Sequence, residues 1–229
     1  MNEMPPAAVR EAPWKAGVRA ARANLVPGLV VQLTMVGLLV SYDVYPTFRE
    51  ALGHLAETKV RWGWIYSGLS GAVAGGVLPE LLRIFVFQKG RLRRSNLSEL
   101  GFAIPFWAVM GIAVDFFYRG QALMFGDEAK PSVVIPQVLV DQFLFTPFYA
   151  NPVTVWLYGW KNRGYRWPER AFTLGFFREK MLPALIANWG VWIPIVCVIY
   201  TLPEPVQIPM FSLALSMWVM LYSWIAREG

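Results

Sequence analysis

Residues 25–42 read LVPGLVVQLTMVGLLVSY, and the first charged side chain after them is Asp43. A helix that crosses the hydrocarbon core of a bilayer needs about 20 consecutive, mostly apolar residues. This stretch and its immediate flanks supply that length. It therefore predicts a membrane-spanning helix, and the rest of the chain repeats the pattern.

Five further apolar blocks follow the first. The six blocks cover residues 25–42, 62–87, 100–125, 132–160, 181–202 and 206–226. Only 16% of the 229 residues are charged, whereas about a quarter of the residues in a soluble domain are charged. We therefore expect an all-α polytopic transmembrane bundle of about six spanning helices, with a four-helix core and extra helices.

The basic residues support six crossings, because Lys and Arg concentrate on the side of a membrane that is not translocated. With six spans, most basic loop residues fall on the side that holds both termini. The opposite side holds only Arg49, Lys59, Arg61 and Lys130. We expect that both termini lie on the cytoplasmic side, and that the net charge of +6 reflects topology rather than nucleic-acid binding.

Two N-terminal segments precede the main bundle. Residues 1–24 form a basic, cytoplasmic-side segment without the apolar core of a signal peptide, so we expect no cleavable signal. Residues 25–60 are expected to form an extra transmembrane helix and a loop. The lack of a clear presequence and this extra span favour a bacterial cytoplasmic membrane over a mitochondrial inner or peroxisomal membrane.

Small residues recur in the second block at helical spacing. Gly68, Ala72 and Gly76 fall on one helical line, and Gly71 and Gly75 fall on an adjacent line. Such spacing lets the backbones of two membrane helices approach closely. We interpret these residues as packing positions within one chain rather than as a dimer seam.

Charged residues inside the blocks form two local pairs. Glu80 and Arg83 are three residues apart, and Asp115 and Arg119 are four apart, so each pair shares one helix face. Local pairing lowers the cost of a charge in the membrane. We interpret the first pair as a neutralised interfacial pair. For the second, such a pair and the polar lining of a solute path remain equal alternatives.

Asp141 differs, because no Lys or Arg lies within four residues of it. It sits about nine residues, or ~14 Å, into its block, near the middle of the membrane. An acid at that depth needs a partner inside the bundle, which Arg119, Gln142, Asn188 or a similar group can supply, unless Asp141 is protonated. Pro147 and Pro152 follow and predict a kinked helix.

Asn188 lies in the fifth block, where an amide side chain is most often a hydrogen-bonding clamp between helices. The chain has one His and one Cys, so a Cys/His zinc site would lack ligands. It also lacks an acid–base pair or an activated nucleophile. We therefore expect no enzyme, metal or other cofactor. The expected partner is the lipid bilayer, with small solutes and a homo-oligomer as further candidates.

The order of three motifs resembles the Mpv-seventeen / peroxisomal membrane protein twenty-two family. The first motif matches at Asp141, Gln142 and Pro147, the second at Asn188, Trp189 and Trp192, and the third at Trp218, Ser223 and Trp224. Tyr118 is similar to the aromatic segment before the family's central loop. The chain departs from the family at Gly75–Gly76, Glu80, Pro194, Val196, Ile199 and Leu221.

The resemblance covers about residues 62–226 and implies a multispanning membrane bundle with a pore-like role in the passage of small solutes. In that interpretation Asp115, Arg119, Asp141, Gln142 and Asn188 line or gate a polar interior. The alternative is a structural or assembly protein whose polar residues only clamp helices together. A membrane enzyme is the least favoured function.

Overall fold

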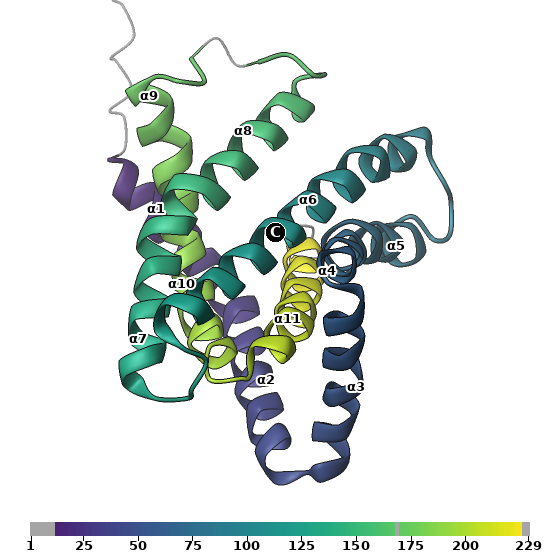
Figure 1. The fold of residues 1–229 in the computed structure, drawn as a ribbon. Helices are drawn as coiled ribbons and strands as arrows, with labels where there is room; N and C mark the ends of the chain where they lie inside the picture. The colour runs from purple at the N-terminus through teal and green to yellow at the C-terminus, as the bar shows by residue number, and fades with distance from the viewer. Residues whose placement is uncertain (1–11, 168–169, 226–229) are drawn as a thin grey trace, which may run out of the picture.

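A computed structural model describes residues 12–167 and 170–225, with side chains as far as Val219. The expectations for residues 1–11 and for the side chains of Leu221, Ser223 and Trp224 lie outside that part. Within it the chain forms an all-α bundle of eight continuous helices without strands (Figure 1). In chain order they are α1 (Pro13–Ala23), α2 (Leu25–Val44), α3 (Pro46–Trp62), Trp64–Phe87, α6 (Arg94–Phe125), Pro131–Asn162, Leu174–Ile199 and α11 (Glu204–Ile225).

Three of these helices contain π-helical segments, in which hydrogen bonds join residues five apart. The helix Trp64–Phe87 comprises α4 (Trp64–Gly71), a π segment (Ala72–Val77), α5 (Leu78–Leu82) and a second π segment (Arg83–Phe87). The helix Pro131–Asn162 comprises α7 (Pro131–Val140), a π segment (Asp141–Ala150) and α8 (Asn151–Asn162). The helix Leu174–Ile199 comprises α9 (Leu174–Phe176), a π segment (Phe177–Met181) and α10 (Leu182–Ile199).

Five of the eight helices are long and apolar enough to cross a membrane, which confirms the expected all-α membrane bundle. They correspond to the first five apolar blocks of the sequence. The sixth block forms α11, which lies in the middle of the bundle in Figure 1. Its residues Met210 and Ala214 are fully buried in a core shared with α2, α3, α6 and α10.

Two segments that were not expected to be spans are helical. Residues 46–62, expected as part of a loop, form α3 because Leu52 and Ala56 supply a narrow apolar face that packs into the core. Residues 13–23 form α1, which packs along α10. Gly17 permits this contact, since a Cβ atom there would lie 2.8 Å from Ile186.

Helices α2 and α3 form an antiparallel hairpin with two different outer surfaces. Its turn extends beyond the turn that joins α10 to α11 (Figure 1). On α2 the exposed side chains are apolar, including Leu33, Val36 and Val40. On α3 exposed polar side chains are mixed with the exposed apolar side chains of Leu55, Val60 and Trp62, and the side chains of His54 and Glu57 are each 80% exposed. Helix α2 therefore presents an apolar surface, whereas α3 presents a mixed surface that carries exposed charge.

The small residues of the second block pack against α6. A Cβ atom at Gly71 would lie 2.3 Å from the Trp107 carbonyl oxygen, and one at Gly75 would lie 2.3 Å from the Trp107 ring. A Cβ atom at Gly68 would lie 3.2 Å from Ile112, and one at Gly76 would lie 3.2 Å from the Ala103 backbone, both on α6; Ala72 is buried. Backbone contact between α4 and α6 is thus made within one chain.

Replacing Gly71 with alanine is expected to destabilise the protein by about 1–3 kcal/mol, because the added methyl group meets the backbone of α6 and the two helices must separate. Thermal unfolding of the purified protein in detergent measures this. The matched control is Gly37→Ala, since a Cβ atom at Gly37 meets nothing within 4 Å. Equal melting temperatures for the two variants would show that the crossing tolerates wider spacing.

Candidate functional site

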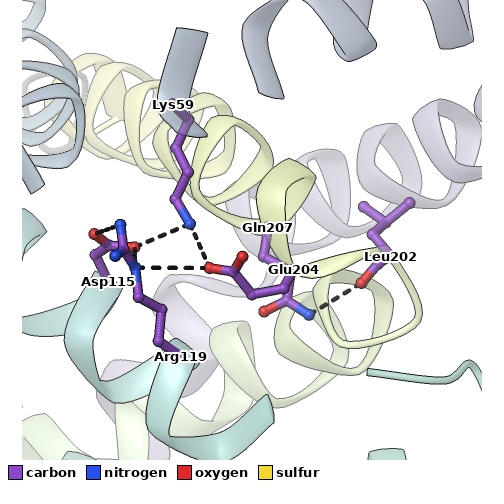
Figure 2. A network of polar contacts seen from close by, with 6 residues as sticks. All are labelled: Lys59, Asp115, Arg119, Leu202, Glu204 and Gln207. Atoms are coloured by element: carbon purple, nitrogen blue, oxygen red, sulfur yellow. Dashed lines mark hydrogen bonds and ion pairs between the residues drawn. The ribbon is translucent and has the colours of Figure 1, made fainter. Parts of the chain in front are cut away.

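Four charged side chains from three helices meet inside the bundle; we call them the ion cluster (Figure 2). The guanidinium of Arg119 donates to both carboxylate oxygens of Asp115, at 3.1 and 2.9 Å. Lys59 Nζ lies 3.2 Å from Asp115 Oδ1 and also pairs with Glu204. Arg119 Nε lies 3.9 Å from Glu204 Oε1. Two cations and two anions therefore form one formally neutral network.

Local structure places each member of the ion cluster. Asp115 and Arg119 are one turn apart on α6, so their pairing is set within that helix. Lys59 lies in the last turn of α3 and Glu204 in the first turn of α11. A cation at a helix C-terminus and an anion at a helix N-terminus both interact favourably with the helix dipole.

The ion cluster is buried on one side and exposed on the other. The side chains of Asp115 and Lys59 are 0% and 2% exposed, whereas those of Arg119 and Glu204 are 38% and 21% exposed. Gln207 lies beside Glu204 in Figure 2 and donates its amide to the Leu202 carbonyl at 3.0 Å. The cluster is therefore open to the surroundings of the bundle through Arg119 and Glu204.

A second polar group surrounds Asp141, and we call it the Asp141 network. Tyr200 donates its hydroxyl to Asp141 Oδ2 at 2.8 Å. The amide of Gln142 and the hydroxyl of Thr146 donate to Asp141 Oδ1, at 3.0 and 3.2 Å. Gln121 of α6 in turn donates to the Tyr200 hydroxyl at 3.1 Å. Residues from the helix Pro131–Asn162, from the end of α10 and from α6 thus converge on one carboxylate.

The π segment Asp141–Ala150 determines which residue faces Asp141. In a π-helix, residues five apart are stacked, whereas in an α-helix the neighbour is four residues away. Thr146 is five residues beyond Asp141 and donates to it, whereas Phe145 packs its ring on Phe117 at 4.0 Å. The wider turn therefore brings a hydroxyl to the carboxylate where an α-helix would bring an aromatic ring.

Pro147 creates a further contact in the same segment. Its nitrogen carries no hydrogen, so the carbonyl of Gln142, five residues earlier, has no partner within the π-helix. The indole N–H of Trp189 on α10 donates to that carbonyl at 2.8 Å. The proline therefore frees an acceptor that joins two helices. Figure 1 shows the chain changing direction between α7 and α8.

The candidate partners of Asp141 fall into three cases. Gln142 is a partner, as expected. Arg119 is not, because its guanidinium is held by Asp115 and Glu204. Asn188 is half-buried, and no side-chain hydrogen bond joins it to any residue that the structure describes. Its neighbour Trp189 makes the contact between helices instead.

The other predicted pair, Glu80–Arg83, lies away from both polar groups. Arg83 Nη1 is 3.4 Å from Glu80 Oε2, and Asn96 donates to the other carboxylate oxygen. Because Asn96 is in the first turn of α6, Glu80 ties α5 to the start of that helix.

Several residues of the site were not predicted from the sequence. Lys59 was assigned to a loop, but it falls on the buried face of α3 at the spacing of Leu52 and Ala56, and that spacing was the available signal. The other missed residues are Gln121, Thr146, Tyr200 and Glu204. Polar character inside apolar blocks was the signal for Gln121 and Thr146.

The ion cluster and the Asp141 network are neighbours in the fold. Tyr118 of α6 lies one turn after Asp115, and its ring packs on Tyr200 with centroids 5.1 Å apart. The carbonyl oxygens of four buried amides accept no hydrogen bond from the described residues; they belong to Gln121, Gln137, Gln142 and Gln207. Buried acceptors of this kind usually bind water or another donor. The described residues contain no group of His, Cys, Asp and Glu that could hold a metal ion.

Comparisons with protein-family models, with curated proteins and with solved structures find no match to this chain. The resemblance to the Mpv-seventeen / peroxisomal membrane protein twenty-two family therefore depends on the three sequence motifs alone. What the fold establishes is a helical bundle of the kind that is integral to a membrane.

Proposed function

We propose that this integral membrane protein forms a path for small solutes, with a water-filled recess beside the α2–α3 hairpin that ends at the ion cluster. The observation that carries the proposal is the exposed charge of α3 next to the exposed apolar surface of α2. A hairpin that separates lipid from water needs these two surfaces. An amphipathic wall of this kind is common to pores that cross a bilayer.

The depth of the ion cluster supports the recess. At 1.5 Å per residue, Lys59 lies about 20 Å along α3 from Pro46, while α2 is about 30 Å long, the thickness of the hydrocarbon core. With α2 across the bilayer, the cluster lies within the hydrocarbon layer. A guanidinium that is 38% exposed at that depth needs water rather than lipid around it.

The turn between α10 and α11 gives independent support. It contains Thr201 and Pro203 and lies next to Glu204, at the level of the ion cluster. Irregular backbone at membrane depth is tolerated only where protein covers it or water reaches it. Pro203 is exposed, so a hydrated recess satisfies this requirement. In the proposed path the paired ion cluster is the closed gate, and the Asp141 network lies behind it.

The proposal includes the pore-like role that the family resemblance implies, in a bacterial cytoplasmic membrane. The proposed solutes are small polar molecules of either charge, because the ion cluster contains both cations and anions. The second candidate is a structural or assembly role without transport. One observation favours it: all four members of the ion cluster are paired, as expected of an interhelical clamp.

The flux of small polar solutes from proteoliposomes tests the path. Blocking that flux with a thiol reagent at a chosen position is the sharper measurement. In a Cys197→Ala background, Glu57→Cys places a thiol on the proposed water side and Val40→Cys places one on the lipid side. We expect a bulky, membrane-impermeant thiol reagent to label Glu57→Cys and suppress most of its flux. Val40→Cys should be neither labelled nor blocked, because lipid excludes the charged reagent.

Two outcomes would separate the candidates. Labelling of Glu57→Cys without measurable flux through the unmodified protein supports the structural role. Equal labelling at both positions would mean that the hairpin stands in water, and the recess would then be wrong.

A further inference from the structure

An apolar groove lies between α6 and α8, away from the polar site. It has a volume of about 370 Å³ and is lined mainly by apolar and aromatic side chains, among them Phe102, Phe106, Val109, Tyr149, Val153 and Trp160. Along α6 it runs from Gly101 to Met110, which corresponds to about 14 Å of helix. Gly101 and Val109 are exposed, so the groove opens sideways, toward the surroundings of the bundle.

Aromatic rings keep α6 and α8 apart and fix the floor of the groove. The Tyr158 ring lies edge-on to both Phe102 and Phe106, with centroids 5.1 Å apart in each case. Trp107 donates its indole N–H to the Tyr158 hydroxyl at 3.0 Å. Because these contacts lie inside one chain, the groove is a built feature that exists before anything binds in it.

One end of the groove has the composition of a membrane–water interface. Trp160 is packed by Tyr165 at 4.8 Å and by Trp167 at 5.9 Å, and such aromatic residues concentrate at the level of lipid headgroups. Two exposed arginines, Arg163 and Arg166, flank Tyr165 in the chain. Lys161 lies inside this end, where it pairs with Glu99.

We propose that the groove binds one acyl chain of an anionic phospholipid, with the headgroup phosphate held at Arg163 and Arg166. Both halves of the lipid are matched: apolar lining along the membrane-buried part and exposed cations at the headgroup level. Arginine suits phosphate because its planar guanidinium donates two parallel hydrogen bonds. A second helix is a poorer occupant, because a helix is about 10 Å wide and the groove offers only about 370 Å³ along about 14 Å of α6. This inference is independent of the proposed solute path.

Native mass spectrometry of the protein released from bilayers of phosphatidylglycerol and phosphatidylcholine tests the site. We expect the protein to retain phosphatidylglycerol in preference to phosphatidylcholine. Val109→Trp fills the groove from its open edge. It should lower retention of phosphatidylglycerol about tenfold, because it displaces roughly two methylene groups of the acyl chain from the groove. Phe116→Trp is the control, because it is equally exposed on the same side of α6 but lies two turns beyond the groove.

Two further variants guard against misfolding and test the headgroup. Gly101→Leu fills the other end of the groove, where a Cβ atom meets nothing within 4 Å, so it should fold and reproduce the loss. The double variant Arg163→Gln and Arg166→Gln should retain both lipids equally, whereas Arg61→Gln should keep the preference. Equal retention by Val109→Trp, Gly101→Leu and the control would overturn the site. A dimer that covers the groove and retains no lipid would also overturn it.

Discussion

Replacing Asp115 with leucine is expected to lower the free energy of unfolding by about 3–5 kcal/mol, because it removes one partner of a buried ion pair. Asp115 is fully buried and contacts both cations of the ion cluster, as the more exposed Glu204 also does. Its loss leaves Lys59 and Arg119 with Glu204 alone, so the buried group gains a net positive charge. Unfolding of the purified protein in detergent, by heat or by denaturant, measures the effect.

Two comparisons separate this electrostatic effect from a general loss of packing. Adding Lys59→Met to Asp115→Leu restores charge balance, so the double variant should regain much of the lost stability. Glu128 and Lys130 form an ion pair at 2.6 Å with side chains that are 60% and 64% exposed. Glu128→Leu should therefore cost less than about 1 kcal/mol. If the double variant is as unstable as the sum of its single changes, Lys59 and Asp115 are not coupled.

The difference between local and long-range contacts explains what the sequence could predict. The pair Asp115–Arg119 follows from helical spacing, and the apolar blocks follow from composition, so both could be read directly. Lys59 and Glu204 are 145 residues apart, and nothing local in either segment indicates that they meet. Counting basic residues on the two sides of the membrane placed Lys59 in a loop. Its position on the apolar face of α3 indicated instead that it is buried.

The helix around Asp141 shows a second limit. Predictions of shared faces assumed 3.6 residues per turn, which puts Phe145 next to Asp141. The π segment replaces it with Thr146, and Pro147 then frees the Gln142 carbonyl for Trp189. Proline in the sequence indicated an irregular helix, but not the widening that determines which side chains meet. Asp141 and Gln142 were identified, whereas the partners that complete the network were not.

Replacing Asp141 with leucine is expected to destabilise the protein by about 3 kcal/mol, because three buried donors lose their acceptor at once. The donors come from Tyr200, Gln142 and Thr146, and none of them can reach bulk solvent without moving a helix. Asp141→Asn keeps one oxygen at the same place, so it should cost about 1 kcal/mol, close to the loss of one hydrogen bond. Unfolding in detergent compares the two variants with Tyr200→Phe, which removes a single donor.

Flux per folded molecule then separates a path from a clamp at Asp141. Asp141→Asn should retain the fold but removes the ionisable carboxyl group, so a path that passes the Asp141 network should change its solute flux severalfold. If Asp141 only clamps helices together, every variant that folds should have unchanged solute flux. Only Asp141→Leu should then lose folded protein. The matched control is Gln32→Leu, which removes a polar contact between α2 and α10 that involves no member of the ion cluster or of the Asp141 network. If Gln32→Leu alters flux as much as Asp141→Asn does, the effect comes from helix packing, and Asp141 does not line the path.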